Sequence, residues 1–252
     1  MGYFKNFQKT SYDLDGDGYY ATLTNLTHFS RIGTKYLDDV SFYSYYNISE
    51  GERPDVVSYK LYDTTEYYWT FFIINNGLFN AFNDWPKGTA DLPEFVEAKY
   101  PNLAAISAQI NATSFDEIAG KFSIGEVVRG GVSGALGVIT AKYPTLGYIE
   151  IKPTSGTFRE SGEGIYGITT QDFLNTSSII KRAYAPRYHT DISTGEQTFR
   201  RVAGTQPFTN FEWEYEQNIE KSKIRVIKPR YIQEVAREFR KEMKSKVAWQ
   251  KT

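Results

Sequence analysis

Residues 43–86, YSYYNISEGERPDVVSYKLYDTTEYYWTFFIINNGLFNAFNDWP, decide the fold, because no other stretch of the chain is as dense in aromatic and aliphatic side chains. The tyrosine-rich residues 43–48 alternate weakly and predict a strand. Glu50-Gly51-Glu52 is a turn signal, and Pro54 suits the first position of a helix, where its missing N–H costs no hydrogen bond. Apolar residues at helical spacing then continue to Tyr62. The stretch therefore opens with a strand, a turn and a helix.

A second helix follows directly. Asp63 and Glu66 have the spacing of a capping box, which predicts a helix over residues 67–76. Apolar residues cover nearly its whole circumference, so we expect it to be buried, with Trp69 and Ile73 in the core. A loop then leads into a second extended piece, which gives the order β-α-α-β.

This order of elements over this length resembles that of a LysM module. The residues that carry the resemblance are Tyr46, Ile48, Gly51, Glu52, Val57, Leu61 and Asn75. LysM modules that bind glycans usually have Asp-Thr after the turn glycine, whereas this chain has Glu52-Arg53-Pro54.

A narrower resemblance fits that departure. The chain is similar to the small LysM-like baseplate wedge subunit of T-even-type contractile-tailed bacteriophages. The matching residues are Arg53-Pro54, Leu61-Tyr62, Tyr68-Trp69, Asn75 and Asp84-Trp85-Pro86. The resemblance covers residues 31–100, returns at residues 218–221 and 224–229, and does not cover residues 121–170.

The resemblance implies a structural function. It implies a subunit that joins baseplate wedge subunits during assembly, contacts wedge scaffold and sheath-initiator-like proteins, and is present in six copies per baseplate. It places the protein in the virion tail, after assembly in the host cytoplasm. The alternative is a LysM-type module that binds peptidoglycan glycans through the Gly51 turn and the loop after the second helix.

The sequence as a whole predicts an α+β protein in four segments. Residues 1–40 form an N-terminal extended arm with a strand over 20–27, and residues 41–120 form the LysM-like core with a flanking helix. Residues 121–170 form a small all-β insertion, and residues 171–252 form a β-hairpin and a basic amphipathic helix. The insertion is rich in glycine and β-branched residues, and Phe122–Gly130 echoes Phe158–Gly167. Because the insertion begins and ends on the same pattern, we expect it to be self-contained, with its ends close together.

The predicted hairpin has strands over residues 196–200 and 208–215. In the second strand, aromatic residues alternate with Glu212, Glu214 and Glu216. The acidic face could supply catalytic carboxylates, but alternation on a half-exposed strand also explains it.

The predicted C-terminal strand and helix cover residues 218–246. Pro229 starts the helix, whose apolar stripe is Ile232, Val235, Phe239 and Met243. Residues 221–252 hold eleven Lys and Arg against three Glu, so residues 1–220 carry a net charge of −9 within a total of −1. Two interpretations remain open: the helix docks on another baseplate subunit, with Trp249 in the interface, or it packs on its own domain.

The composition gives little support to catalysis. The chain has no Cys, and its two histidines, His28 and His189, lie in no nucleophile motif. We expect no catalytic residue, no cofactor site and no enzymatic activity. The glutamates interleaved with the C-terminal basic residues speak against nucleic acid as a partner. The longest apolar run, residues 71–74, is too short to span a membrane, and residues 1–18 lack a secretion signal.

One motif invites a calcium interpretation. Asp13, Asp15 and Asp17 precede Gly18 at the spacing of an EF-hand loop. The ninth and twelfth positions, however, are Ala21 and Thr24, where an EF-hand loop needs a water-bridging ligand and a bidentate glutamate. We therefore expect an Asp/Gly turn and no metal site.

Overall fold

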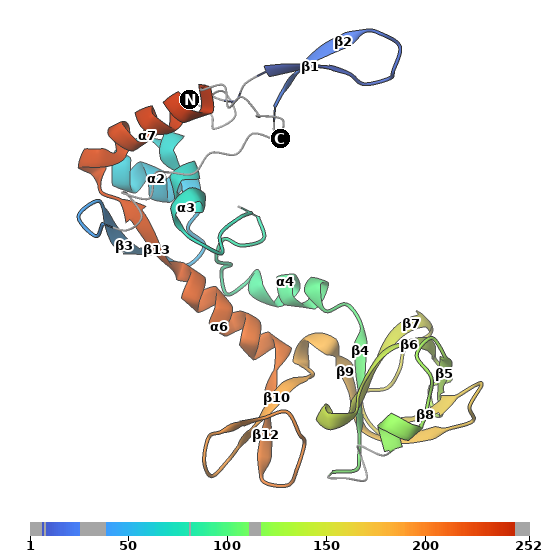
Figure 1. Cartoon of the computed structure of the whole chain (residues 1–252). Helices are drawn as coiled ribbons and strands as arrows, with labels where there is room; N and C mark the ends of the chain where they lie inside the picture. Colours follow the sequence, from blue (N-terminus) through green and yellow to red (C-terminus); the bar gives the residue numbers. More distant parts are fainter. Residues whose placement is uncertain (1–6, 8, 26–38, 81, 111–116, 245–252) are drawn as a thin grey trace, which may run out of the picture. The chain divides into compact units, whose positions relative to one another are not determined.

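The computed structural model describes residues 7, 9–25, 39–80, 82–110 and 117–244 (Figure 1). Helices and strands are mixed along the chain, so the predicted α+β class is confirmed. The chain divides into two compact units, one of residues 1–89 and 218–252 and the other of residues 90–217. The second unit is thus inserted into the first. The predicted boundaries at residues 120 and 170 both fall inside the second unit.

The first unit is built on a strand pair that spans the insertion. Strand β3 (Tyr43–Asn47) pairs antiparallel with β13 (Lys223–Ile227), with Tyr45 opposite Arg225 (Figure 1). The prediction that residues 43–86 contain the whole β-α-α-β unit is therefore wrong in its second strand, which comes from residues 223–227. Residues 84–86 form a loop instead, because the Trp85 indole is buried and its Nε1 donates a 2.7 Å hydrogen bond to the carbonyl of Glu52.

Between the paired strands lie helix α2 (Pro54–Tyr62), the 3₁₀ turn η2 (Thr65–Tyr67) and helix α3 (Trp69–Ile74). The predicted capping box is wrong. Asp63 adopts a left-handed conformation (φ 55°), and its N–H bonds to the carbonyl of Tyr59, so it ends α2. Thr64 caps the next turn instead, since its side chain accepts a hydrogen bond from the N–H of Glu66.

Helix α7 (Pro229–Lys244) packs within the first unit. Its residues Ile232 and Val235 are buried with Ile74, and Phe239 is buried against Trp69, with ring centroids 4.5 Å apart. Over its described residues the apolar stripe is thus covered by its own chain, as the second interpretation expects, while docking of this element on another subunit stays a prediction. The side chain of Met243, and Trp249, lie outside the described residues.

The predicted arm contains a hairpin of β1 (Lys9–Asp13) and β2 (Tyr20–Thr24). The Asp13 carboxylate closes its turn, because its two oxygens accept from the N–H groups of Gly16 (2.7 Å) and Gly18 (2.9 Å). Asp13 thus acts as a turn residue, as does Asp17, whose Oδ1 accepts from the N–H of Tyr19 at 3.0 Å. Residues 26–38 of the arm, including the end of the predicted strand, lie outside the described residues.

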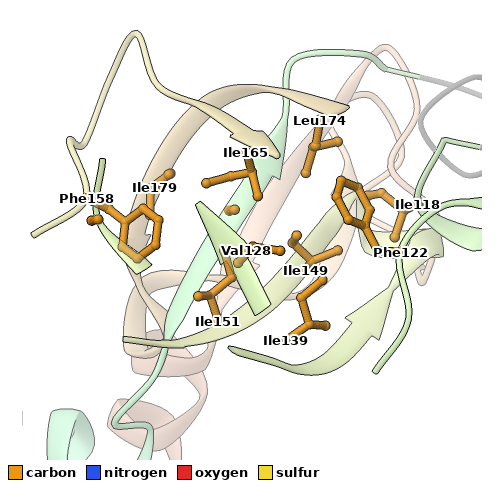
Figure 2. Close-up of a cluster of buried hydrophobic side chains, with 12 residues drawn as sticks. Ile118, Phe122, Val128, Ile139, Ile149, Ile151, Phe158, Ile165, Leu174 and Ile179 are labelled. Carbon is orange, nitrogen blue, oxygen red and sulfur yellow. The ribbon is translucent and has the colours of Figure 1, made fainter. Parts of the chain in front are cut away.

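The second unit contains a closed six-stranded barrel, with strand order β4-β7-β6-β5-β8-β9. The strands are β4 (Leu103–Ser107), β5 (Val127–Gly130), β6 (Leu136–Tyr143), β7 (Tyr148–Ser155), β8 (Gly164–Gly167) and β9 (Phe173–Lys181). Figure 2 shows the core, where Val128, Ile149 and Ile165 point toward one another. The insertion predicted over 121–170 is too short, because β4 and β9 lie outside those limits and both belong to the barrel.

The barrel contains an internal repeat with an offset of 37 residues. Strands β5 and β6 start at residues 127 and 136, and β8 and β9 start at residues 164 and 173. Strand β6 has a register shift at Thr140 and β9 has one at Ser177, which are again 37 apart. The hydrogen bond from Gly130 to the carbonyl of Ala135 recurs from Gly167 to Asp172. The echo noticed in the sequence is therefore a structural repeat, in which β5–β6 corresponds to β8–β9.

Two buried glutamates hold the repeat together. Glu126 precedes β5, and its Oε1 accepts from the N–H groups of Thr169 (3.0 Å) and Thr170 (2.7 Å) after β8. Glu163 precedes β8, and its Oε1 accepts from Val132 (2.7 Å) and Ser133 (3.1 Å) after β5. Each glutamate thus fixes the turn that follows the neighbouring strand.

The rest of the second unit contains helix α4 (Leu92–Lys99), the 3₁₀ turns η3 (Pro144–Leu146) and η4 (Arg182–Tyr184), and a small sheet. The sheet strands are β10 (Pro186–Asp191), β11 (Gln197–Thr198) and β12 (Thr205–Thr209), and helix α6 (Asn210–Ser222) follows. The strand predicted over 208–215 is wrong beyond Thr209. Thr209 and Glu212 form a capping box, with Glu212 N to Thr209 Oγ1 at 3.1 Å and Thr209 N to Glu212 Oε2 at 2.6 Å, and this box starts the helix.

Candidate protein-interaction surface

The loop between Leu78 and Trp85 in the first unit presents two aromatic side chains to solvent. Leu78 and Trp85 are buried at its two ends. Between them, Asp84 Oδ2 accepts from the N–H groups of Phe79 (2.9 Å) and Asn80 (2.8 Å). Phe79 is 84% exposed and Phe82 is 85% exposed. Exposed rings on a fixed backbone bind a partner with little loss of conformational entropy, so this loop is suited to protein contact.

The turn after β3 lies beside this loop. Trp85 Nε1 bonds to the carbonyl of Glu52, and the N–H of Thr89 bonds to Glu50 Oε1 at 2.9 Å. Gly51 has φ 68°, a conformation that glycine adopts without strain. The two segments that the LysM resemblance gives as a glycan site, the Gly51 turn and the loop after the second helix, are therefore brought together.

The Glu52 carboxylate organises that turn. It is buried, and it accepts from the N–H of Ser49 (3.0 Å) and the hydroxyl of Tyr46 (3.0 Å), with the ammonium of Lys60 at 2.5 Å. Burial on its own raises the pKa of Glu52, but the Lys60 charge and these hydrogen bonds outweigh it and hold the pKa below its usual value. Glu52 is thus an ionised structural group that fixes the turn before α2.

The outer face of the β3–β13 pair is aromatic and basic. The ammonium of Lys223 lies 5.1 Å from the centroid of the Tyr45 ring, and the Arg225 guanidinium lies 5.5 Å from that of Tyr43. Tyr45 is 61% exposed. The sequences of β3 (YSYYN) and β13 (KIRVI) contain no carboxylate. This face therefore carries positive charge among tyrosines, a composition common at interfaces.

Helix α6 carries all three glutamates considered as catalytic and places Glu214 on a different face from Glu212 and Glu216. Glu214 is buried, and its carboxylate accepts from the Lys99 ammonium and the Tyr100 hydroxyl, both at 2.8 Å. Glu212 belongs to the capping box of the helix, and Glu216 is exposed. Glu212 and Glu214 thus have structural roles, the first at the start of the helix and the second in its packing on α4.

Of the two histidines, the structure describes His189. His189 lies in β10 and is buried, and its Nδ1 has no hydrogen-bond partner among the described residues. Burial, with the charge of Arg201 nearby, lowers the pKa of His189 to about 4. The residue is thus a neutral core group at physiological pH. His28 lies outside the described residues.

Among the described residues, no three His, Asp or Glu side chains are grouped closely enough to hold a metal ion. No helix in the described part of the chain is long and apolar enough to cross a bilayer.

Two features of the first unit were not predicted from the sequence. They are the exposed Phe79 and Phe82, and the outer face of the β3–β13 pair. The signal for the first was present, since Asn80 and Asp84 flank Phe82 in a loop between buried anchors. Comparison of the sequence with models of known protein families and with curated proteins finds no match.

Proposed function

We propose that this chain is a structural subunit of a bacteriophage contractile-tail baseplate wedge, in which it joins other wedge subunits during assembly. The observation that supports the proposal most strongly is that the two regions of resemblance supply the two paired strands of the first unit. The resemblance to the wedge family falls on residues 31–100 and again on residues 218–221 and 224–229. Those two regions, separated by the inserted unit, supply the paired strands β3 and β13 and the helices between them.

In this proposal, β3, α2, α3 and β13 form a LysM-like module whose β-α-α-β order is interrupted by residues 90–217. The module has two surfaces for neighbouring subunits. One is the loop with the exposed Phe79 and Phe82, and the other is the tyrosine-rich outer face of the β3–β13 pair. Wedge scaffold and sheath-initiator-like proteins are the proposed partners, with six copies of this chain per baseplate.

The test is incorporation into tails. An affinity-tagged chain is produced during phage growth, and intact tails are isolated by sedimentation and probed for the tag. We expect the tag in the tail fraction at about six copies per tail, and loss of incorporation in the double variant F79A/F82A. Absence of the tagged chain from intact tails, with the untagged chain also absent by mass spectrometry, would refute the proposal.

A glycan-binding module is the second candidate. The observation that favours it is the contact between the Gly51 turn and the loop that ends at Thr89. Against it, Arg53 and Pro54 stand where glycan-binding LysM modules carry Asp-Thr, and the Arg53 guanidinium pairs with Asp55 at 3.2 Å. Sedimentation with insoluble peptidoglycan decides between the two, since saturable binding that soluble glycan fragments displace would support the second candidate.

A further inference from the structure

The two long edges of the β3–β13 sheet differ. Hydrogen bonds from Ile48 N to the carbonyl of Ser222 (2.8 Å) and from Lys228 N to the carbonyl of Phe42 (2.9 Å) bracket the pair. Bonded and non-bonded pairs alternate in an antiparallel ladder, so even-numbered residues of β3 bond to β13. The N–H and C=O groups of Tyr43, Tyr45 and Asn47 therefore point away from β13.

The far edge of β13 is closed by side chains. Asn75 acts as a substitute strand, since its Oδ1 accepts from the N–H of Arg225 (2.8 Å) and its Nδ2 donates to the carbonyl of Arg225 (2.9 Å). The hydroxyl of Tyr62 donates to the carbonyl of Ile227 at 2.8 Å. The N–H and carbonyl of Arg225 and the carbonyl of Ile227 are thus engaged on this edge.

The edge of β3 is open. Among the described residues, no strand pairs with β3 on the side away from β13. Proteins protect open edges with lysine, proline or a bulge, and the sequence YSYYN contains neither residue while its register with β13 is unshifted. An open, tyrosine-rich edge without a bulge favours pairing with another extended segment.

We propose that the free edge of β3 receives an extended, acidic segment of another polypeptide, which adds to the sheet as a third strand. This edge adds to the proposed function a defined surface and the chemistry of its partner. Only the identity of the partner as a tail subunit rests on the proposed function. Main-chain hydrogen bonds to Tyr43, Tyr45 and Asn47 supply the affinity of such a complex, and alternate side chains supply the specificity.

The charge of the adjoining face selects an acidic segment. The side chains of an added strand that fall on this face lie opposite Tyr43 and Tyr45. The Lys223 ammonium lies over the Tyr45 ring, which places positive charge above β3 itself. Carboxylates at alternate positions of the partner segment are therefore attracted, and lysines are repelled. A second copy of this chain is disfavoured, because a β3–β3 pairing brings the Lys223 and Arg225 residues of both copies onto one sheet.

The probe is a ten-residue synthetic peptide of alternating Glu and Thr, labelled with a fluorophore. One control peptide alternates Lys and Thr. A second control has the Glu-Thr sequence with N-methyl groups on alternate residues, which removes the donors on one edge and keeps every side chain. Binding to the full chain is measured by fluorescence anisotropy, and backbone amide exchange is measured by NMR.

We expect the Glu-Thr peptide to bind and to slow exchange at the amides of Tyr45 and Asn47 by at least tenfold, while both control peptides bind at least tenfold more weakly. The variant K223E should weaken binding of the Glu-Thr peptide about tenfold, whereas K241E, a matched change at an exposed position on α7, should leave it unchanged. Equal binding of all three peptides, or no binding, would overturn the proposal.

Protection of the same amides in a dimer formed without peptide would also overturn it and would identify a second copy as the occupant. Tail incorporation separates this inference from the proposed function. If the chain enters tails but no peptide binds, the edge proposal alone fails. If the Glu-Thr peptide binds but the chain is absent from tails, the proposed function alone fails.

Discussion

Lys87 and Asn218 are 131 positions apart in the sequence and exchange two hydrogen bonds. The N–H of Lys87 donates to Asn218 Oδ1 at 2.7 Å, and Asn218 Nδ2 donates to the carbonyl of Lys87 at 2.9 Å. Both residues belong to the first unit, and the inserted residues 90–217 lie between them in the sequence. The two ends of the insertion are therefore fastened together by the unit that receives it.

This relationship predicts that the inserted unit can be removed. Replacing residues 90–217 with a short Gly/Ser linker should give a folded protein, because a short loop closes at little entropic cost when its ends already meet. Circular dichroism and cooperative thermal unfolding check the result. The matched control replaces residues 121–170, which removes four barrel strands and leaves β4 and β9, and should yield insoluble protein. A soluble, cooperatively folding control would contradict the barrel boundaries.

The paired glutamates of the barrel should be equally sensitive to change. In E126Q and E163Q, an amide NH₂ or a weaker neutral oxygen faces backbone N–H donors in a buried site, so each should lower the free energy of unfolding by about 2 kcal/mol. E160Q, a change at an exposed position, should alter it by less than about 0.5 kcal/mol. Denaturant unfolding provides the measurement, and a large cost for only one of the two glutamates would contradict the repeat.

Their hydrogen bonds also set a pH dependence. Burial raises the pKa of Glu126 and Glu163, but the backbone donors outweigh it and hold each pKa below its usual value. The stabilisation is therefore present above the unfolded pKa of about 4.5 and is lost as pH falls through the folded pKa. The double variant E126Q/E163Q should show a shallower loss of melting temperature below pH 4.5 than the unchanged chain.

Trp69 joins helices α3 and α7. Because its ring is buried against Phe239, the change W69A should lower the free energy of unfolding by about 3–5 kcal/mol. F79A is the matched control, since the Phe79 ring is exposed and its loss should cost less than about 0.5 kcal/mol. Urea titration of both variants measures the difference. A small cost for W69A would mean that α7 is not packed on α3.

His189 should make the protein less stable in mild acid. The unfolded chain binds a proton at this residue near pH 6.5, whereas the folded protein does so near pH 4. The free energy of unfolding therefore falls as pH drops from 6.5 toward 4, and His189 accounts for at most about 3 kcal/mol of this loss. The variant H189N should reduce the change in melting temperature over that range. An NMR titration of the imidazole with a midpoint near 6.5 would contradict the burial of this group.

Local signals in the sequence predicted local elements well. Strand β3, helix α2 and the start of helix α7 follow from tyrosine-rich alternation, Pro54 and Pro229, each of which acts over a few residues. Helix α6 was missed because Phe211, Trp213 and Tyr215 alternate like a strand. The Thr209–Glu212 capping box that decides for helix was present in the sequence, as the hydrogen bonds confirm.

Long-range pairings could not be predicted in the same way. Nothing local to β3 specifies that its partner is β13, and nothing local to β4 specifies that it closes a barrel with β7 and β9. The glutamate pair of the barrel is a further case. Gly125-Glu126 and Gly162-Glu163 repeat visibly, but which turn each carboxylate holds depends on how β5 and β8 pair. The open edge of β3, the proposed docking site, follows only from the observed ladder.

The pairing of β3 with β13 also fixes an order of events at the ribosome. Residues 43–47 are translated well before residues 223–227, and the whole of residues 90–217 is translated between them. The barrel unit therefore has all its strands, and begins to fold, while β3 is still without its partner. During that interval the apolar side chains of β3 and α2 lack the cover that β13 later gives them. The core of the first unit is therefore complete only after both β13 and helix α7 have been translated, because both supply buried side chains to it.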